Sequence, residues 1–238
     1  MRILVSNDDG INAKGIAKLA ELAKQFGEVV VVAPAHQCSA MSAKITICQN
    51  MELKKAAFPV EGVEAYSLDG TPADCVKVAL EYLLKEKPDY VFSGMNFGYN
   101  TSIETCYSGT VAAAMEGLMK GIPAIAFSTD FVDDYGTADK YGKEVVEKIF
   151  AQKPLCGEIW NVNFPSCSPE DCKGILWDRK LARHQYYADA YNEKGKTEEG
   201  ILIQLEGQPV KEAMEGSDIE ALLNGYVSVG KIRNTVFG

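Results

Sequence analysis

Two adjacent aspartates, Asp8 and Asp9, stand in the stretch NDDG, shortly after the apolar run Ile3–Val5. Neighbouring carboxylates repel each other, and beside an apolar core that repulsion raises the pKa of one of them unless a proton or a cation is shared. The next four residues include no lysine or arginine. A bound metal ion is therefore the first hypothesis for this motif.

The geometry of the motif leaves two interpretations open. In a continuing strand, Asp8 and Asp9 would point to opposite faces of the sheet. Gly10 allows a sharp turn directly after them, so that both carboxylates can face one ion. Alternatively, NDDG is an ordinary turn with an Asx cap for a helix that begins near Asn12 or Ala13.

Two further side chains could supply oxygen ligands at the ends of other expected strands. Ser39 lies in APAHQCSA after the apolar run Val29–Ala33, and Asn96 lies in SGMNFGYN after Tyr90–Ser93. Taken singly, a loop serine is usually solvated or caps a helix, and Asn and Gly favour turns. Together with the two aspartates they make an all-oxygen set, which favours Mg²⁺, Mn²⁺ or Ca²⁺ over softer metals.

Zinc is the weaker alternative for this site. His36 and Cys38 lie close to Ser39, but the chain has only two histidines, and the other one, His184, lies in a loosely patterned region. No His/Cys spacing typical of a tetrahedral zinc site occurs.

A phosphate site is indicated by Ser108, Gly109 and Thr110, which open an alanine-rich helical pattern. Backbone N–H groups at a helix start, two hydroxyls and the positive end of the helix dipole bind phosphate well, although ordinary N-capping is the simpler explanation. Neither the dinucleotide motif G-x-G-x-x-G nor the P-loop motif occurs in these loops, which argues against a dehydrogenase or a P-loop ATPase. A magnesium or manganese ion beside a phosphate site predicts hydrolysis of a phosphomonoester.

The elements that position these residues alternate between apolar runs and helical patterns, which predicts a mostly parallel sheet covered on both faces. In such a sheet, ligands collect at the carboxyl ends of the strands. The expected strands are Ile3–Val5, Val29–Ala33, Val63–Leu68, Tyr90–Ser93, Pro123–Phe127 and Ile159–Asn163. The expected helices are one from about Asn12 to Gly27, one capped by Thr71 that includes Pro72 and Asp74 and ends near Lys85, Gly109–Lys120 and Asp139–Phe150.

Two segments depart from this alternation. Lys44–Lys55 places apolar and polar residues in near alternation, which suits a hairpin outside the parallel sheet. Ser166–Glu199 is polar and charged with tyrosines spaced through it, which suits a protruding hairpin or an oligomer arm.

Composition narrows the classes of function. The 238 residues are 47% hydrophobic, enough for one packed core. A net charge of −9 argues against nucleic-acid polymers and anionic membranes as partners. Seven cysteines without C-x-x-C spacing favour a reducing compartment. With no leader pattern and no apolar run near the roughly 18 residues of a membrane span, we expect a soluble cytoplasmic protein.

In chain order, the stretches NDDG, Ser39 after AP, DGTPADCV, SGMNFGYN, YSGTVAAAMEG, GIPAIAFS and NVNFP resemble the SurE family of metal-dependent nucleotidases, over residues 1 to about 165. The resemblance implies a 5′(3′)-nucleotidase that releases phosphate from nucleoside monophosphates, with some activity on short polyphosphate. It implies a Mg²⁺ or Mn²⁺ ion held by Asp8, Asp9, Ser39 and Asn96, and substrate contacts from Asn96, Ser108, Gly109 and Thr110. A metal-bound water would attack phosphorus, with an oxygen of Asp8 or Asp9 assisting.

The resemblance also implies a Rossmann-like three-layer α/β/α sandwich. A catalytic core over residues 1–165 would be followed by a C-terminal extension, 166–238, that exchanges between the subunits of a homodimer or homotetramer. Here the family's Thr-Asp and Ser-Ile-Thr-Pro patterns are replaced by Ser217-Asp218 and Ser228-Val229-Gly230-Lys231, and the region around Tyr186 and Tyr187 matches loosely. These departures bear on oligomer geometry and base selection rather than on catalysis.

Two other classes of protein share part of the pattern. A receiver-like regulatory domain also carries paired aspartates after its first strand, but it is far shorter and needs a phospho-accepting aspartate after a middle strand, where this chain has asparagines. A phosphatase with a phospho-aspartate intermediate would show D-x-D spacing, which NDDG lacks.

Overall fold

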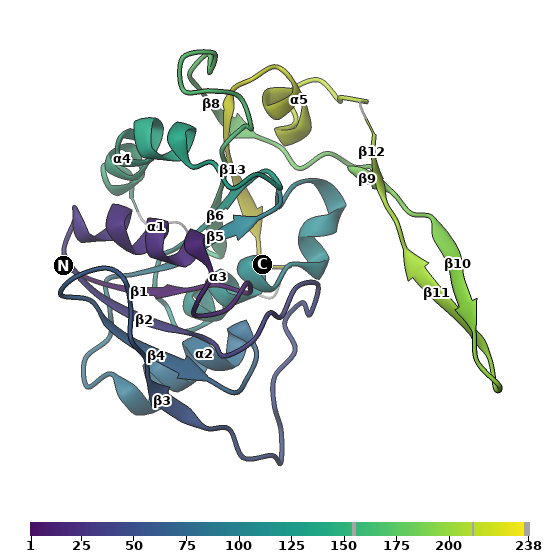
Figure 1. The fold of residues 1–238 in the computed structure, drawn as a ribbon. Helices are drawn as coiled ribbons and strands as arrows, with labels where there is room; N and C mark the ends of the chain where they lie inside the picture. The colour runs from purple at the N-terminus through teal and green to yellow at the C-terminus, as the bar shows by residue number, and fades with distance from the viewer. Residues whose placement is uncertain (154–155, 211, 236–238) are drawn as a thin grey trace.

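A nine-stranded sheet forms the centre of the molecule, in the order β3-β4-β2-β1-β5-β6-β7-β13-β8 (Figure 1). The computed structural model describes residues 1–153, 156–210 and 212–235. The strands of this sheet are β1 (Arg2–Ser6), β2 (Glu28–Pro34), β3 (Leu53–Lys55), β4 (Glu64–Leu68), β5 (Tyr90–Phe97), β6 (Ala124–Thr129), β7 (Glu158–Asn163), β8 (Ile175–Arg179) and β13 (Val227–Arg233). Neighbouring strands pair in parallel along the run β4-β2-β1-β5-β6-β7. Strand β3 runs antiparallel to β4, and β13 runs antiparallel to β7.

Helices cover both faces of this sheet. In β1, Ile3 and Val5 pack into a core shared with α1 (Lys14–Lys24) and α4 (Gly136–Phe150). Leu4, on the opposite face, packs into a core shared with α2 (Pro72–Val78) and α3 (Gly109–Met119). Because parallel strands are buried on both sides, they are apolar at every position rather than at alternate ones. The predicted three-layer α/β/α sandwich with a mostly parallel sheet is confirmed.

The start of α2 is built as its sequence predicts. Thr71 is the N-cap, Pro72 occupies the first turn, and the side chains of Thr71 and Asp74 bond reciprocally to each other's backbone N–H groups. The α-helix ends at Val78 and continues as one π-helical turn, η1 (Ala79–Leu83), rather than as an α-helix to Lys85.

The predicted hairpin over Lys44–Lys55 is wrong. Only Leu53–Lys55 forms a strand, and that strand joins the edge of the main sheet against β4 instead of lying outside it. The preceding segment is irregular because Thr46 and Lys44 bond to side chains at the start of α2 rather than to a partner strand.

The segment after residue 165 contributes both to the sheet and to a long protrusion. β8 lies inside the region expected to be a hairpin or arm, but it extends the main sheet next to β13. Beyond it, two short ladders form an arm that projects from the body (Figure 1). The ladders pair β9 (Tyr187–Ala188) with β12 (Gln208–Pro209) and β10 (Tyr191–Lys196) with β11 (Ile201–Leu205).

The chain returns to the sheet through α5 (Asp218–Leu223) and β13, which pairs with β7 of the same chain. The division at residue 165 and the exchange of the extension between subunits stay predictions. All seven cysteines are free thiols. Among the residues that the structure describes, no helix combines the length and the apolar composition of a membrane span.

Candidate metal and phosphate site

The predicted site residues lie at the topological switch point of the sheet, where the strand order reverses. β1 lies between β2 and β5, so the connections that leave β1 and β5 diverge to opposite sides and open a crevice at their carboxyl ends. Asp8 and Asp9 follow β1, and Ser39 follows β2. Asn96 belongs to β5 itself, because this strand continues to Phe97 beyond the predicted end at Ser93.

The turn in NDDG is made by Asn7 rather than by the aspartates. The Asn7 amide donates to the carbonyl of Gly10 at 3.0 Å and accepts from its N–H at 3.2 Å. Gly10 has φ +97°, a conformation that favours glycine. Helix α1 begins after Ala13 without a side-chain cap. The Asx interpretation therefore applies to Asn7 and leaves the two carboxylates for other contacts.

Asp8 is buried, with 3% of its surface exposed, and Thr110 fixes both of its oxygens. The Thr110 hydroxyl donates to Oδ1 at 2.6 Å, and the Thr110 N–H donates to Oδ2 at 3.1 Å. Burial raises the pKa of Asp8 to about 6, against the opposing effect of the Thr110 hydroxyl and with a further contribution from the charge of Asp9. The ionised form therefore lacks full compensation from the protein.

Asp9 is half-buried and is held by the backbone of β5. The N–H of Phe97 donates to Asp9 Oδ2 at 2.9 Å. Burial raises the pKa of Asp9, and the bonds from Phe97 and Gln37 oppose this rise. The nearby cation Lys14 is paired with Asp133. Within the described residues, no lysine, arginine or histidine forms an ion pair with Asp8 or Asp9, so a bound cation would supply a counter-charge that the protein itself does not.

A cavity of about 200 Å³ brings four of the predicted residues together. Its lining includes Asp8, Ser39, Asn96 and Ser108. Asp9 lines a neighbouring cavity instead, and Phe97 lines both. The two spaces thus meet at the segment that binds the Asp9 carboxylate.

The amide of Asn96 is oriented by its own strand end. Its nitrogen donates to the carbonyl of Gly98 at 2.7 Å, which turns Oδ1 toward the Thr110 hydroxyl, 3.5 Å away. This hydroxyl is the one that donates to Asp8. The amide oxygen is therefore presented on the same side as the buried carboxylate, where a hard cation would find a neutral ligand.

At the start of α3, the predicted phosphate-binding residues already have structural roles. The Ser108 hydroxyl accepts from the N–H of Val111 at 3.0 Å, which is ordinary N-capping. A Cβ atom on Gly109 would lie 2.8 Å from Cβ of Asp8, so only glycine fits there. Thr110 directs its N–H and its hydroxyl to Asp8. Phosphate binding by these three residues stays a prediction.

The donor chemistry fits a hard cation better than zinc. The described residues contain no group of three or more His, Cys, Asp or Glu side chains placed to hold a metal. Burial and the nearby Asp8 raise the pKa of the Cys38 thiol, which disfavours the thiolate that zinc binds. His184 contacts the carbonyl of Glu212 in the C-terminal region, away from the site. Two carboxylates and neutral oxygens are the set that Mg²⁺ or Mn²⁺ prefers.

Sequence reasoning missed the aromatic side of the cavity. Its lining also includes Phe97, Tyr99, Tyr107 and Phe131. Phe97 and Phe131 contact edge to face with ring centroids 5.4 Å apart, and Tyr107, at the end of the 3₁₀-helix η2 (Ser102–Tyr107), is 62% exposed. The stretches SGMNFGYN and CYSGT contain three of these aromatic residues, but only the fold shows that all four share one cavity.

Comparison with known proteins places this site in a family. The family described as Survival protein SurE matches residues 3–187 of the chain. The chain belongs to the SurE family. The family match runs from Ile3 in β1 to Tyr187 in β9 and so includes every candidate ligand.

Individual SurE proteins are similar over nearly the whole chain. The 5′-nucleotidase SurE of Clostridium botulinum is 38% identical over 235 residues, which cover 96% of this chain and 91% of that protein. The 5′-nucleotidase SurE of Flavobacterium psychrophilum is 40% identical over 240 residues, covering 95% and 89%. The crystal structure of the SurE protein from Aquifex aeolicus superposes with a TM-score of 0.82 at 34% identity and covers 98% of this chain and 93% of that one.

Proposed function

We propose that this SurE-family chain is a metal-dependent 5′-nucleotidase that hydrolyses nucleoside 5′-monophosphates to nucleoside and inorganic phosphate. The observation that carries the proposal is the buried Asp8 beside Asp9, without a cationic partner among the described residues, facing a cavity at the start of α3. The names of the relatives from Clostridium botulinum and Flavobacterium psychrophilum support this activity.

We propose Asp8, Asp9, Ser39 and Asn96 as the residues that hold Mg²⁺ or Mn²⁺. When bound, such an ion would neutralise the carboxylates, polarise a phosphoryl oxygen and lower the pKa of a water molecule. Thr110 keeps Asp8 in one orientation through two hydrogen bonds, and the Phe97 N–H does the same for Asp9. The protein thus fixes the ligands before the ion arrives.

The substrate phosphate would lie at the N-terminus of α3, where Ser108, Gly109 and Thr110 present the positive end of the helix dipole. Water attacks phosphorus from the side opposite the nucleoside oxygen, and a carboxylate oxygen of Asp8 or Asp9 takes its proton. The new P–O bond forms as the bond to the nucleoside breaks, and the leaving oxygen takes up a proton. Asn96 would contact the phosphoryl group from the end of β5.

The aromatic side of the cavity supports a nucleoside as the organic part of the substrate. Tyr107 and Phe131 are 62% and 56% exposed at the cavity that Asp8 lines. An aromatic ring stacks on any nucleobase, which favours nucleotides over simple phosphate esters without selecting one base. We propose 3′-monophosphates and short polyphosphate as further substrates on the strength of the family resemblance.

The test is a panel of phosphate esters with phosphate detection. Purified protein with Mn²⁺ or Mg²⁺ should release phosphate from AMP or GMP through many turnovers, and EDTA should stop the reaction. Turnover that persists in EDTA would refute the metal-dependent mechanism.

The receiver-like alternative makes a different prediction. A receiver domain incubated with acetyl phosphate would form an acid-stable, base-labile phospho-aspartate and would not turn over nucleotides. At the end of β5 the chain carries Asn96 rather than an aspartate. We expect no such adduct, and finding it would favour the regulatory class.

We also propose a homo-oligomer, dimer or tetramer, that acts in the cytoplasm. The arm exposes at least half of five large apolar side chains, a surface that a second copy would cover. They are Tyr191, Ile201, Leu202, Ile203 and Leu205. The free thiols of the chain suit a reducing compartment. Light scattering of the intact chain and of a chain without residues 190–206 tests whether the arm contributes to assembly.

A further inference from the structure

The segment from residue 35 to residue 52 carries Ser39 but forms neither helix nor strand. Most of its residues after Cys38 are exposed, so hydrophobic packing contributes little to its position. Three of its residues, Ala40, Ser42 and Cys48, have positive φ values. Its conformation must therefore depend on the hydrogen bonds that attach it to the body of the protein.

Two of those attachments lie beside the candidate site. The N–H of Cys38 donates to the carbonyl of Asp8 at 2.7 Å. Ser42 donates its N–H to the carbonyl of Tyr107 at 2.9 Å and its hydroxyl to the carbonyl of Cys106 at 2.8 Å. Ser39 lies between these two attachment points, and its position also depends on where the rest of the segment, beyond Ser42, is held.

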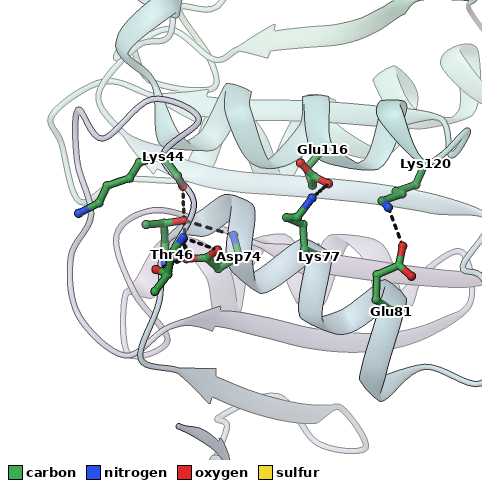
Figure 2. A network of polar contacts seen from close by, with 8 residues as sticks. Lys44, Thr46, Asp74, Lys77, Glu81, Glu116 and Lys120 are labelled. Atoms are coloured by element: carbon green, nitrogen blue, oxygen red, sulfur yellow. Dashed lines mark hydrogen bonds and ion pairs between the residues drawn. The ribbon is translucent and has the colours of Figure 1, made fainter. Parts of the chain in front are cut away.

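That anchor is the start of α2 (Figure 2). Thr46 donates its N–H to Asp74 Oδ1 at 3.0 Å and its hydroxyl to Oδ2 at 2.7 Å. Thr71 donates its N–H to the same Oδ2 at 3.0 Å, and its hydroxyl contacts the carbonyl of Lys44 at 2.5 Å. Asp74 is 3% exposed, so these donors take the place of water around its carboxylate.

These contacts exceed what capping α2 requires. A capping box needs only the reciprocal bonds between Thr71 and Asp74. Thr46 and Asp74 are 28 residues apart in sequence, so the bonds between them join the segment that carries Ser39 to α2. Hydrogen bonds from Thr46 and Thr71 outweigh burial and hold the pKa of Asp74 below its ordinary value, in keeping with an ionised carboxylate.

Helix α2 and the turn η1 that follows it are in turn attached to α3 and its C-cap residue Lys120 (Figure 2). Helix α3 begins at the candidate phosphate site. Lys77 pairs with the buried Glu116 at 3.0 Å, and Glu81 pairs with Lys120 at 2.6 Å. The starts of the two helices are also close, since a Cβ on Gly109 would lie 3.0 Å from Cγ of Pro72. The start of α2 thus lies between the segment that carries Ser39 and the helix that orients Asp8.

We propose that Asp74 is a positioning residue that holds Ser39 beside Asp8 and Asn96 through its bonds to Thr46. This inference rests on the proposed metal site. It assigns to the Asp of DGTPADCV a role in metal affinity, exerted through the loop and without contact with metal or substrate. An isosteric Asp74→Asn change removes the charge and turns one acceptor oxygen into a donor that faces the Thr46 and Thr71 donors.

The test is a double-mutant cycle on Mn²⁺ binding, measured by calorimetry without nucleotide on the full chain. Asp74→Asn should weaken Mn²⁺ binding about ten-fold, the order expected for a residue that orients a metal ligand. In a Ser39→Ala background the same change should have little further effect, because the positioned ligand is already gone. Hydrogen exchange of the metal-free variant should be faster over residues 38–46. The matched control is Asp89→Asn, which weakens a carboxylate bond to the N–H of Arg2. This bond lies at the amino ends of β1 and β5, away from the site at their carboxyl ends, so the change should leave Mn²⁺ affinity unchanged.

Equal weakening by Asp74→Asn in both backgrounds would overturn the inference, because it would show an effect that does not pass through Ser39. Unchanged affinity in the single variant would overturn it as well. Both results presuppose that the wild-type chain binds Mn²⁺ and hydrolyses nucleotides. If it does neither, the proposed function itself fails.

Discussion

Replacing Gly109 with alanine should disable the site while leaving the fold intact. An added Cβ would lie 2.8 Å from Cβ of Asp8, 3.0 Å from its Oδ2 and 3.0 Å from Cγ of Pro72. Carbon atoms in contact ordinarily lie about 3.5–4.0 Å apart, so Asp8 or the start of α3 must move by roughly 0.7–1.2 Å. Because Oδ2 accepts the Thr110 N–H, the movement also disturbs that bond.

The two consequences differ in size. Overpacking costs about 1–3 kcal/mol of stability, and the better helix propensity of alanine returns about 1 kcal/mol, so the net loss is roughly 0–2 kcal/mol. A displacement near 1 Å at a reacting group costs on the order of 100-fold in rate. We therefore expect kcat/KM for AMP to fall about 100-fold with only a small drop in Tm.

The matched control is Gly117→Ala on the same helix. There a Cβ would lie 2.6 Å from Cγ2 of Val91, at the far end of α3 from the site. This variant should lose similar or greater stability and keep most of its activity. Activity of Gly109→Ala within three-fold of wild type, or an equal loss of activity in both variants, would refute the argument that Asp8 must keep its position.

Three further predictions follow from the same contacts. Asp9→Asn retains an oxygen that can accept the Phe97 N–H, so the variant should fold but lose nearly all phosphate release from AMP; retained turnover would contradict a catalytic or ligand role. Tyr107→Ala should raise KM for AMP by on the order of ten-fold and leave KM for ribose 5-phosphate unchanged, because stacking contributes about 1–3 kcal/mol per base; equal effects on both substrates would contradict base stacking. The folded pKa of Asp74 lies below its ordinary value of 3.8, so its ionised form stabilises the protein above about pH 4, and this contribution disappears as the pH falls through the folded pKa. Chemical denaturation should accordingly show the stability difference between wild type and Asp74→Asn shrinking below pH 4; a difference that grows on acidification would contradict the sign.

The core of the fold could be predicted because its signals are local. The runs Ile3–Val5 and Val29–Ala33 are apolar at every position, which is the pattern of strands buried on both faces. Both lie within observed strands, as does Ile159–Asn163 within β7. The start of α2 at Thr71 and Pro72 could be predicted for the same reason, because helix capping depends on residues that are close in sequence.

Contacts between distant residues could not be predicted in this way. The alternation in Lys44–Lys55 suggested a hairpin, but its middle is held by Asp74 and Thr71 at the start of α2. Similarly, β8 lies in a polar stretch and forms a strand because β13, from the far end of the chain, supplies its partner. Local periodicity predicts neither the contact with the start of α2 nor the pairing with β13.

The candidate site, too, could be predicted from the sequence only in part. Asp8, Ser39, Asn96 and Ser108 could be placed near one another because parallel strands end at one edge of the sheet, and they line one cavity. The sequence did not indicate that Thr110 would bond to Asp8 through two groups. That arrangement depends on how closely α3 approaches β1, which Gly109 permits.

The most direct test of the central claim is the anomalous diffraction of Mn²⁺ in crystals of the full chain. We predict one strong peak per chain, at a position where a Mn²⁺ ion is bonded to carboxylate oxygens of Asp8 and Asp9 and lies beside Ser39 and Asn96. A manganese-dependent, active protein without a peak at this position, or with its peak elsewhere, would contradict the account.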